Sequence, residues 1–249
     1  MYAGSPQKLT HWARVAGWLM AVWTAPAASA ADLGSRLPSN DAFEAAVQAA
    51  RPVASAQGIS LHTDGLWQPL LAARVPLMAW RQGNRCHIGF TSFTPGRRFD
   101  GLFPVLPAAQ AKVWLDGLVR HELAHCLEGD QPASALQTGA LGPMAAWGPA
   151  SLPHQRWREA RADLAFAIHV DETGEQGEGL IERLLRFRQA SAGHDPAHDS
   201  SPVLSCYLTH PARRADIGHA SHLGEAAAGK GWRATLAVWQ VRCPLAAGP

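Results

Sequence analysis

The feature that most constrains this chain is the motif His121-Glu122-Leu123-Ala124-His125, which lies in a stretch with the apolar pattern of a helix. Positions i and i+4 of an α-helix lie one above the other on the same face, so the two histidines can present their imidazoles to one ion. Glu122 lies about 100° round the helix, where it flanks the ion without binding it. The spacing therefore predicts a zinc site on a helix, with a carboxylate beside it.

A catalytic zinc ion takes three protein ligands and keeps one open position, so a third ligand must come from elsewhere in the chain. Glu159 and Asp163 are again four residues apart, in a stretch whose apolar residues predict a mostly buried helix. A buried carboxylate needs a partner charge or a metal. We predict that Glu159 is the third zinc ligand, and that Asp163 hydrogen-bonds a ligand imidazole and fixes its tautomer.

Two alternatives to this assignment stay open. His154, in the long loop before the helix, could supply the third ligand in place of Glu159. The carboxylates of Glu159 and Asp163 could instead pair with the arginines of their own helix, on a solvated face.

These residues resemble the pattern of a known family. The His-Glu-Leu-Ala-His motif at 121–125, followed by Glu-Ala-Arg-Ala-Asp at 159–163, resembles the HExxH and ExxxD pattern of the gluzincin metallopeptidases. The positions where metzincins carry Gly and His hold other residues. The stretch at 207–217, which contains Thr-His-Pro, is similar to the CAAX prenyl protease and to HtpX-like peptidases. The resemblance covers scattered pieces of residues 107–217 and implies peptide hydrolysis with Zn2+.

One domain of the α+β class is expected over residues 31–249, with a small mixed sheet, an active-site helix and a mainly helical C-terminal half. The resemblance implies that this domain is zincin-like. The expected strands are 59–62, 74–80 and 86–93. The expected helices are 41–51, 107–127, 155–170, 177–190 and 232–241, and a further helix that starts at Thr209-His210-Pro211. A capping box is expected at the start of the first helix, and Thr209 is expected to cap the further helix. The expected loops include 94–101, 129–155 and 191–201, of which the second is long enough to suggest a functional role.

The first 30 residues have the layout of a secretory signal peptide. Lys8 and Arg14 give a basic start, residues 15–22 form a short apolar run, and Ala28-Ser29-Ala30 offers small residues for cleavage. The run is too short for a comfortable membrane span, which needs roughly 20 residues, although an uncleaved anchor is the alternative. We therefore expect a periplasmic or secreted protein with no stable membrane span once the signal is removed.

The remaining chain gives little reason to expect a nucleic-acid partner. Loss of residues 1–30 removes two basic and no acidic side chains, which leaves equal numbers of each. All four cysteines, Cys86, Cys126, Cys206 and Cys243, lie beyond the signal segment. In an oxidising compartment they predict two disulfides with three possible pairings, whereas four buried free thiols are the alternative.

For hydrolysis, Glu122 is expected to act as the general base that accepts a proton from water and delivers it to the leaving amine. A donor near the developing oxyanion is also needed, for which His210 and Tyr207 are candidates and Arg213 is a weaker one. His210 could equally be a solvent-exposed residue at a helix start. Residues 86–93 could form an edge strand that pairs with extended substrate, or an ordinary core strand.

Together these features predict an exported zinc metalloendopeptidase that hydrolyses a peptide or protein substrate. Trp147, in the long loop, is the one tryptophan expected to border the cleft. An exported binding or assembly factor with a structural, non-catalytic zinc site is the alternative, although such a site does not need Glu122. A zinc hydrolase that acts on another amide, such as a cell-wall stem peptide, is a third reading.

Overall fold

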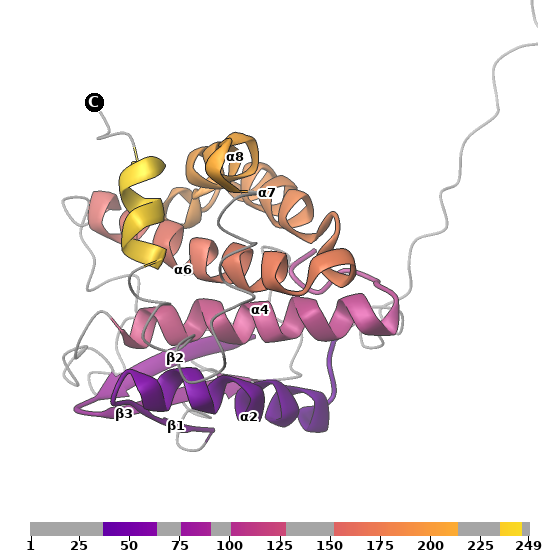
Figure 1. Ribbon diagram of the computed structural model, residues 1–249, viewed down its shortest axis with the longest axis vertical. Helices are drawn as coiled ribbons and strands as arrows, with labels where there is room; N and C mark the ends of the chain where they lie inside the picture. The colour runs from indigo at the N-terminus through magenta and orange to yellow at the C-terminus, as the bar shows by residue number, and fades with distance from the viewer. Residues whose placement is uncertain (1–36, 64–75, 91–100, 128–151, 214–234, 246–249) are drawn as a thin grey trace, which may run out of the picture.

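The computed structural model describes residues 37–63, 76–90, 101–127, 152–213 and 235–245 (Figure 1). A helix and three short strands come first, and the rest of the described chain is helical, which confirms the α+β class. In chain order the elements are α2 (Asn40–Ala56), β1 (Ser60–His62), β2 (Leu77–Gln82), β3 (Arg85–Phe90), α4 (Ala108–Cys126), α6 (Leu152–Glu172), η3 (Gly174–Gly177), α7 (Leu180–Ser191), η4 (Pro196–His198) and α8 (Ser201–Thr209). A last helical stretch covers residues 235–242.

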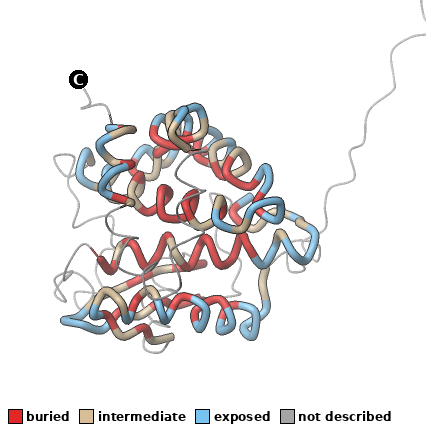
Figure 2. Tube along the Cα trace, in the orientation of Figure 1, coloured by how far each residue is buried: buried red, intermediate tan, exposed pale blue. Residues whose placement is uncertain are grey.

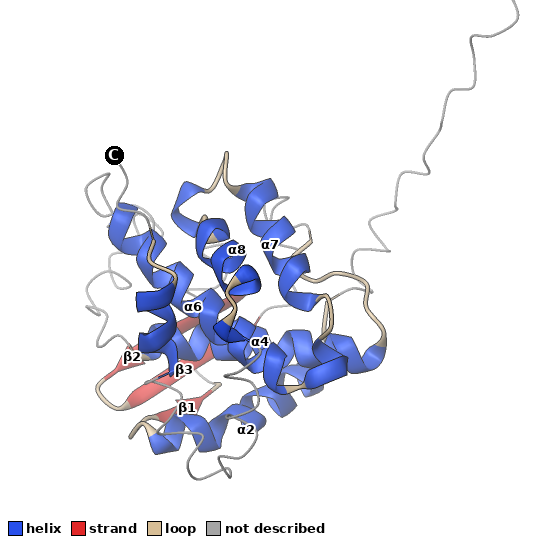
Figure 3. Cartoon of the chain, turned by 45° about the horizontal axis from the view of Figure 1, so that its top comes forward, coloured by secondary structure: helices blue, strands red, loops and turns tan. Residues whose placement is uncertain are grey.

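The three strands form a small mixed sheet in the order β1-β3-β2, so that β3 lies in the middle (Figure 3). Strand β3 runs parallel to β1 and antiparallel to β2, with Cys86 opposite Leu61 and Ile88 opposite Ala79. These four side chains are buried on one face of the sheet, because side chains alternate between the two faces of a strand. Helices α2 and α4 cover that face.

Helix α2 differs from its expected bounds at both ends. Its N-cap is Ser39, whose hydroxyl accepts a hydrogen bond of 3.2 Å from the backbone N–H of Ala42, so the capping box at 41–44 is not what starts it. The predicted end near Arg51-Pro52 is wrong, since the helix continues through Pro52 to Ala56. Burial of Ala54 and of the residues one and two turns before it holds the last turn against the core, which offsets the lost hydrogen bond of proline.

Helices α4 and α6 form the centre of the molecule, and α4 is buried along most of its length (Figure 2). Both were expected, at 107–127 and 155–170. They run antiparallel, and the rings of Trp114 and Phe166 meet edge to face at 5.0 Å between centroids. Gly117 allows this close approach, because a Cβ atom there would come within 2.7 Å of the Phe166 ring. The tight packing fixes the relative position of the two helices that carry the predicted ligands.

The C-terminal half contains a helix that the sequence analysis did not predict. Helix α8 occupies Ser201–Thr209, with Pro202 in its first turn and Tyr207 among its buried residues. The expected cap is therefore wrong: Thr209 ends α8, and its hydroxyl donates back to the carbonyl of Ser205. Residues 212–213 are helical again. There the ring of His210, and not Thr209, accepts a hydrogen bond from the backbone N–H of Ala212. Residues 214–234, which include the start of the helix expected at 232–241, lie outside the described residues.

Two disulfides pair the four cysteines, which confirms the expected number and selects one of the three pairings. Cys86 is joined to Cys126, and this bond ties the central strand β3 to the last residue of α4. Cys206 is joined to Cys243, and this bond ties α8 to the end of the helical stretch at 235–242. Each disulfide therefore joins two elements that are distant in sequence, one at the sheet and one among the C-terminal helices.

Several sequence predictions fall outside the described residues. They are the signal segment at 1–30, most of the loop at 94–101, and the long loop at 129–155 as far as residue 151, including Trp147. Where the chain is described, none of its helices combines the length and the apolar character needed to cross a bilayer.

Candidate metal centre

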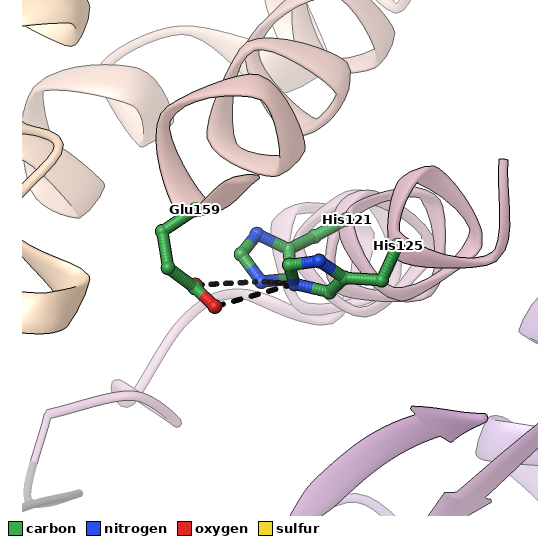
Figure 4. Close-up of side chains that lie close together, drawn as sticks. All are labelled: His121, His125 and Glu159. Atoms are coloured by element: carbon green, nitrogen blue, oxygen red, sulfur yellow. Dashed lines mark hydrogen bonds and ion pairs between the residues drawn. The ribbon is translucent and has the colours of Figure 1, made fainter. Parts of the chain in front are cut away.

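Three side chains that the sequence analysis selected as metal ligands lie together. The Nε2 atoms of His121 and His125 are 3.2 Å apart on α4. Glu159 reaches them from α6, with Oε2 3.4 Å from Nε2 of His121 and Oε1 3.4 Å from Nε2 of His125 (Figure 4). One potential ligand atom from each residue lies within 4.8 Å of the others, and among the described residues this is the one such group of His, Cys, Asp and Glu side chains.

The chemistry of this group fits a zinc ion. Two imidazole nitrogens and one carboxylate oxygen form the His2Glu donor set of catalytic zinc sites. Oε2 of Glu159 is buried and has no hydrogen-bond partner, although a buried carboxylate oxygen normally has one. A cation held between the three side chains would compensate that oxygen and the two ring nitrogens together. The donor set is complete with residues of this chain alone.

The sequence places the two histidines on one face of α4, and the contacts at the end of that helix hold them there. Cys126 follows His125 directly and is bonded to Cys86 of the sheet. The guanidinium of Arg81, on β2, donates a hydrogen bond of 2.8 Å to the backbone carbonyl of Cys126. The last turn of α4, where fraying would move His125, is therefore fixed to the sheet by one covalent bond and one hydrogen bond.

Asp163 lies one turn after Glu159 on α6 and is fully buried. Its Oδ1 atom is 2.8 Å from Nδ1 of His121, within hydrogen-bonding distance. A carboxylate can only accept, so in the neutral ring this contact favours the tautomer with the proton on Nδ1, in which Nε2 can bind a metal. The carboxylate thus lies beside the imidazole of His121, one of the predicted ligands.

The partner charge of Asp163 is an arginine from another helix, not one of those on α6. Arg188 of α7 donates from Nε to Oδ2 at 2.7 Å and from Nη2 to Oδ1 at 2.9 Å. The hydroxyl of Ser200 also donates to Oδ2. Burial raises the pKa of the Asp163 carboxyl, but Arg188 and His121 outweigh burial and hold it below its ordinary value. Asp163 therefore stays ionised in the interior.

Burial and neighbouring charges have different net effects on the imidazoles of His121 and His125. Burial lowers the pKa of His125 to about 3, and the neighbouring charges of His121 and Arg158 act in the same direction, so this ring is neutral. Burial also lowers the pKa of His121, but Asp163 and Glu159 outweigh it and raise the value to about 10. The difference follows from Asp163, which faces only one of the two rings.

Glu122 is buried between α4 and the sheet. Burial is the main cause that raises the pKa of its carboxyl to about 7, and the charge of Glu159 adds to the effect. The charge of His121 and a hydrogen bond from the backbone of Ala79, on β2, act in the opposite direction. The result is a carboxyl group that can gain and lose a proton near neutral pH, next to the ligand group.

One residue of the site was missed by the sequence analysis. His198 belongs to η4, in the stretch expected to be only a polar loop, and its Nε2 lies 3.5 Å from Oε1 of Glu159. Its Nδ1 is 2.8 Å from Oδ1 of Asp195, and its side chain is 36% exposed. Burial lowers the pKa of His198, but Glu159 and Asp195 outweigh burial and raise it. The Asp195-Pro-Ala-His198 spacing was the available signal, since it puts an acid and an imidazole on one turn.

The residues expected to stabilise an oxyanion are not brought to this group. The hydroxyl of Tyr207 donates to Asp171 at 2.8 Å, and Arg213 forms two hydrogen bonds with the same carboxylate. Asp171 lies twelve residues beyond Glu159, which is about 18 Å along α6. The ring of His210 packs edge to face on Trp239 at 5.3 Å and caps a helical turn. Tyr207 and Arg213 therefore bind a carboxylate at the far end of α6, and His210 has partners outside α6.

Two further expectations are resolved by the geometry. His154 stacks on Trp157 within α6, with ring centroids 6.0 Å apart, and is not part of the three-residue group. Strand β3 has a neighbour on each side, so the predicted substrate-binding edge at 86–93 is wrong as far as residue 90. Residues 91–93 lie outside the described part of the chain. Within the described sheet, β2 and β1 are the edge strands, and β2 is the one that contacts Glu122.

No family model, no curated protein and no solved structure matches this chain. The interpretation of the site therefore depends on its residues and on their geometry.

Proposed function

We propose that this chain is an exported, zinc-dependent metallopeptidase of the gluzincin type, with a zincin-like arrangement of its metal helix and sheet. The observation that carries the proposal is the convergence of His121, His125 and Glu159 within 4.8 Å, two from one helix and one from the next. The two disulfides support export, because such bonds persist in oxidising compartments.

Zinc held by these three residues would act as a Lewis acid and would lower the pKa of a bound water to about 7. Glu122 is the residue that moves the proton. It takes the proton from the attacking water and delivers it to the nitrogen of the leaving amine. Its pKa of about 7 suits both steps, because a base works best when its pKa lies close to the operating pH.

Strand β2 is the proposed site for an extended peptide. In the described sheet it is hydrogen-bonded to β3 alone, and the backbone of Ala79 on this strand contacts the carboxylate of Glu122. A peptide that added to its open edge would run beside the general base, and main-chain hydrogen bonds would hold it. This favours a peptide substrate over a compact non-peptide amide.

His198 is the proposed donor to the oxyanion, in place of Tyr207 and His210. The Asp195 carboxylate orients its ring from the Nδ1 side, and Nε2 points towards Glu159. The side chain is partly exposed, so substrate can reach it. A protonated imidazole at this position can donate to the oxygen that becomes negative as the scissile carbonyl is attacked.

The decisive experiment compares the parent protein with Glu122→Gln, and with Glu172→Gln as a carboxylate control near the far end of α6. Zinc content is measured by mass spectrometry, and hydrolysis is measured on a peptide library. We expect Glu122→Gln to keep its zinc and to lose nearly all hydrolysis, because the proton carrier is removed while the ligands stay. The control should keep both properties.

Equal hydrolysis by the parent and Glu122→Gln would disprove the peptidase proposal. A parent protein that binds zinc tightly and cleaves no peptide would favour the structural zinc site of a binding or assembly factor. A parent protein that cleaves only amides of another kind, such as those of cell-wall stem peptides, would keep the mechanism and change the substrate class.

A further inference from the structure

Arg188 is a buried cation that joins α7 to the metal centre. Only 7% of the residue is exposed, and its guanidinium forms two hydrogen bonds with Asp163. Its Nη2 atom also lies 3.8 Å from Oε2 of Glu159. One side chain therefore contacts a proposed ligand and the carboxylate that faces another ligand.

Stability alone is a poor explanation for this arrangement. Removing an arginine and an aspartate from water costs several kcal/mol for each ion, and an apolar pair of similar volume is often equally stable or more so. A buried ion pair is better explained where it fixes one geometry that an apolar pair cannot provide. For Arg188, that geometry is the orientation of the Asp163 carboxylate beside His121.

Both oxygens of Asp163 are held from two sides. Oδ1 lies between Nη2 of Arg188 and Nδ1 of His121, at 2.9 and 2.8 Å. Oδ2 accepts from Nε of Arg188 and from the hydroxyl of Ser200. The planar guanidinium binds the two oxygens in parallel, so the carboxylate cannot rotate without losing both hydrogen bonds. Its plane, and with it the direction of Oδ1, is set by α7.

We propose that Arg188 is a positioning residue for the metal centre: it locks the Asp163 carboxylate so that Oδ1 receives the Nδ1 proton of His121 and Nε2 is aimed at the metal. The inference depends on the proposed metal centre and adds a residue outside the HExxH and ExxxD pattern. A lysine could supply the charge at this position, but it could not supply the two parallel hydrogen bonds.

The test compares Arg188→Lys with Arg213→Lys as the matched control. Arg213 forms the same two-pronged pair with Asp171, at 2.7 and 2.6 Å, but that pair does not contact the three-residue group. Zinc affinity is measured by competition with a chromophoric chelator, and the visible spectrum of the Co2+ form reports the geometry of the ligands. Thermal unfolding of the metal-free proteins shows whether each variant is folded.

We expect Arg188→Lys to bind zinc about 10–100-fold more weakly than the parent, and to show an altered Co2+ spectrum, as for the loss of other groups that orient a metal ligand. Arg213→Lys should lose thermal stability and keep the parent affinity and spectrum. A folded Arg188→Lys protein with the parent affinity and spectrum would overturn the inference. So would an equal loss of affinity in the two variants.

If Arg188→Lys does not fold, Ser200→Ala decides the question. This variant removes one hydrogen bond to Oδ2 and keeps both hydrogen bonds from Arg188, so we expect the zinc affinity and the Co2+ spectrum of the parent. A loss of zinc affinity of about 10-fold or more in Ser200→Ala would show that Arg188 does not by itself hold the carboxylate, and would overturn the inference. Because zinc binding is measured without any substrate, a parent that binds zinc but cleaves nothing affects the proposed peptidase activity alone. A parent that binds no zinc overturns both proposals.

Discussion

Helix α6 carries two aspartates that are held in the same way, two turns apart. The Asp163 carboxylate accepts hydrogen bonds from Nε and Nη2 of Arg188 and from the hydroxyl of Ser200. Asp171 is bound by the fork of Arg213 and by the hydroxyl of Tyr207. Each pair fastens α6 to a neighbouring segment of the C-terminal half. Only Asp163 has an additional neighbour, the imidazole of His121.

The difference shows that the geometry of an ion pair does not decide its role. The lengths of the two arginine forks are similar, so neither pair is distinguished by its hydrogen bonds. The pair at Asp163 is more deeply buried, since the Arg188 side chain is 9% exposed and that of Arg213 is 22% exposed. The role that we propose for Asp163 in metal binding follows from its position beside the His121 ring. Variants along α6 can therefore separate metal binding from stability.

The largest effect is expected at the ligand itself. Glu159→Ala removes one of the three proposed ligands, so zinc affinity should fall by more than about 100-fold, beyond the loss typical of an orienting residue. Glu172→Ala, at the C-terminal end of the same helix, should bind zinc as the parent does. Zinc stoichiometry after dialysis against a mild chelator measures both. Full zinc in Glu159→Ala together with loss of zinc in His154→Ala would move the third ligand to His154.

The next effect distinguishes the two aspartates. Asp163→Asn should weaken zinc binding about 10–100-fold, because a neutral amide oxygen is a weaker acceptor for the His121 ring and the amide NH2 group cannot accept from Arg188, whereas Asp171→Asn should leave zinc binding unchanged. Both variants should be less stable, by about 3 kcal/mol or more for Asp163→Asn and by less for Asp171→Asn, whose arginine keeps access to water. Chelator competition and urea unfolding of the metal-free proteins measure the two properties. Equal zinc affinities in the two variants would remove the distinction between the pairs.

The smallest effect concerns His169, which lies on α6 between the two aspartates. Burial, with the charges of Arg120 and Lys112, lowers its pKa to about 3 in the folded state. The unfolded chain takes up a proton near pH 6.5 that the folded protein does not, so stability present above pH 6.5 is lost as the pH falls towards 3. At pH 5 the loss should be up to about 2 kcal/mol.

His169→Gln, which stays neutral at every pH, should lack this loss. Urea unfolding of the parent and the variant at pH 7.5 and at pH 5 gives the comparison. The difference in stability between the two proteins should shift in favour of the variant at the lower pH. The same difference at both values would show that His169 is not buried in its neutral form.

The sequence by itself determined the features that depend on local geometry. The i and i+4 spacings of His121 with His125 and of Glu159 with Asp163 require only a helix, and both helices formed. The buried face of α4 and the α+β class followed from the periodicity of apolar residues. The sequence also selected the three side chains that could hold a metal ion, because two histidines at i and i+4 lie on one face of a helix.

The tertiary structure alone decided which distant residues meet. Arg188 reaches Asp163 across 25 positions of the chain, and His198 reaches Glu159 from a turn that has no apolar period to mark it. The pairing of the cysteines and the central place of β3 likewise depend on contacts between separate elements. A spacing along one helix fixes an angle and a distance within that helix. The packing of several helices against one another is fixed only by the summed burial of all of them, which no single motif contains.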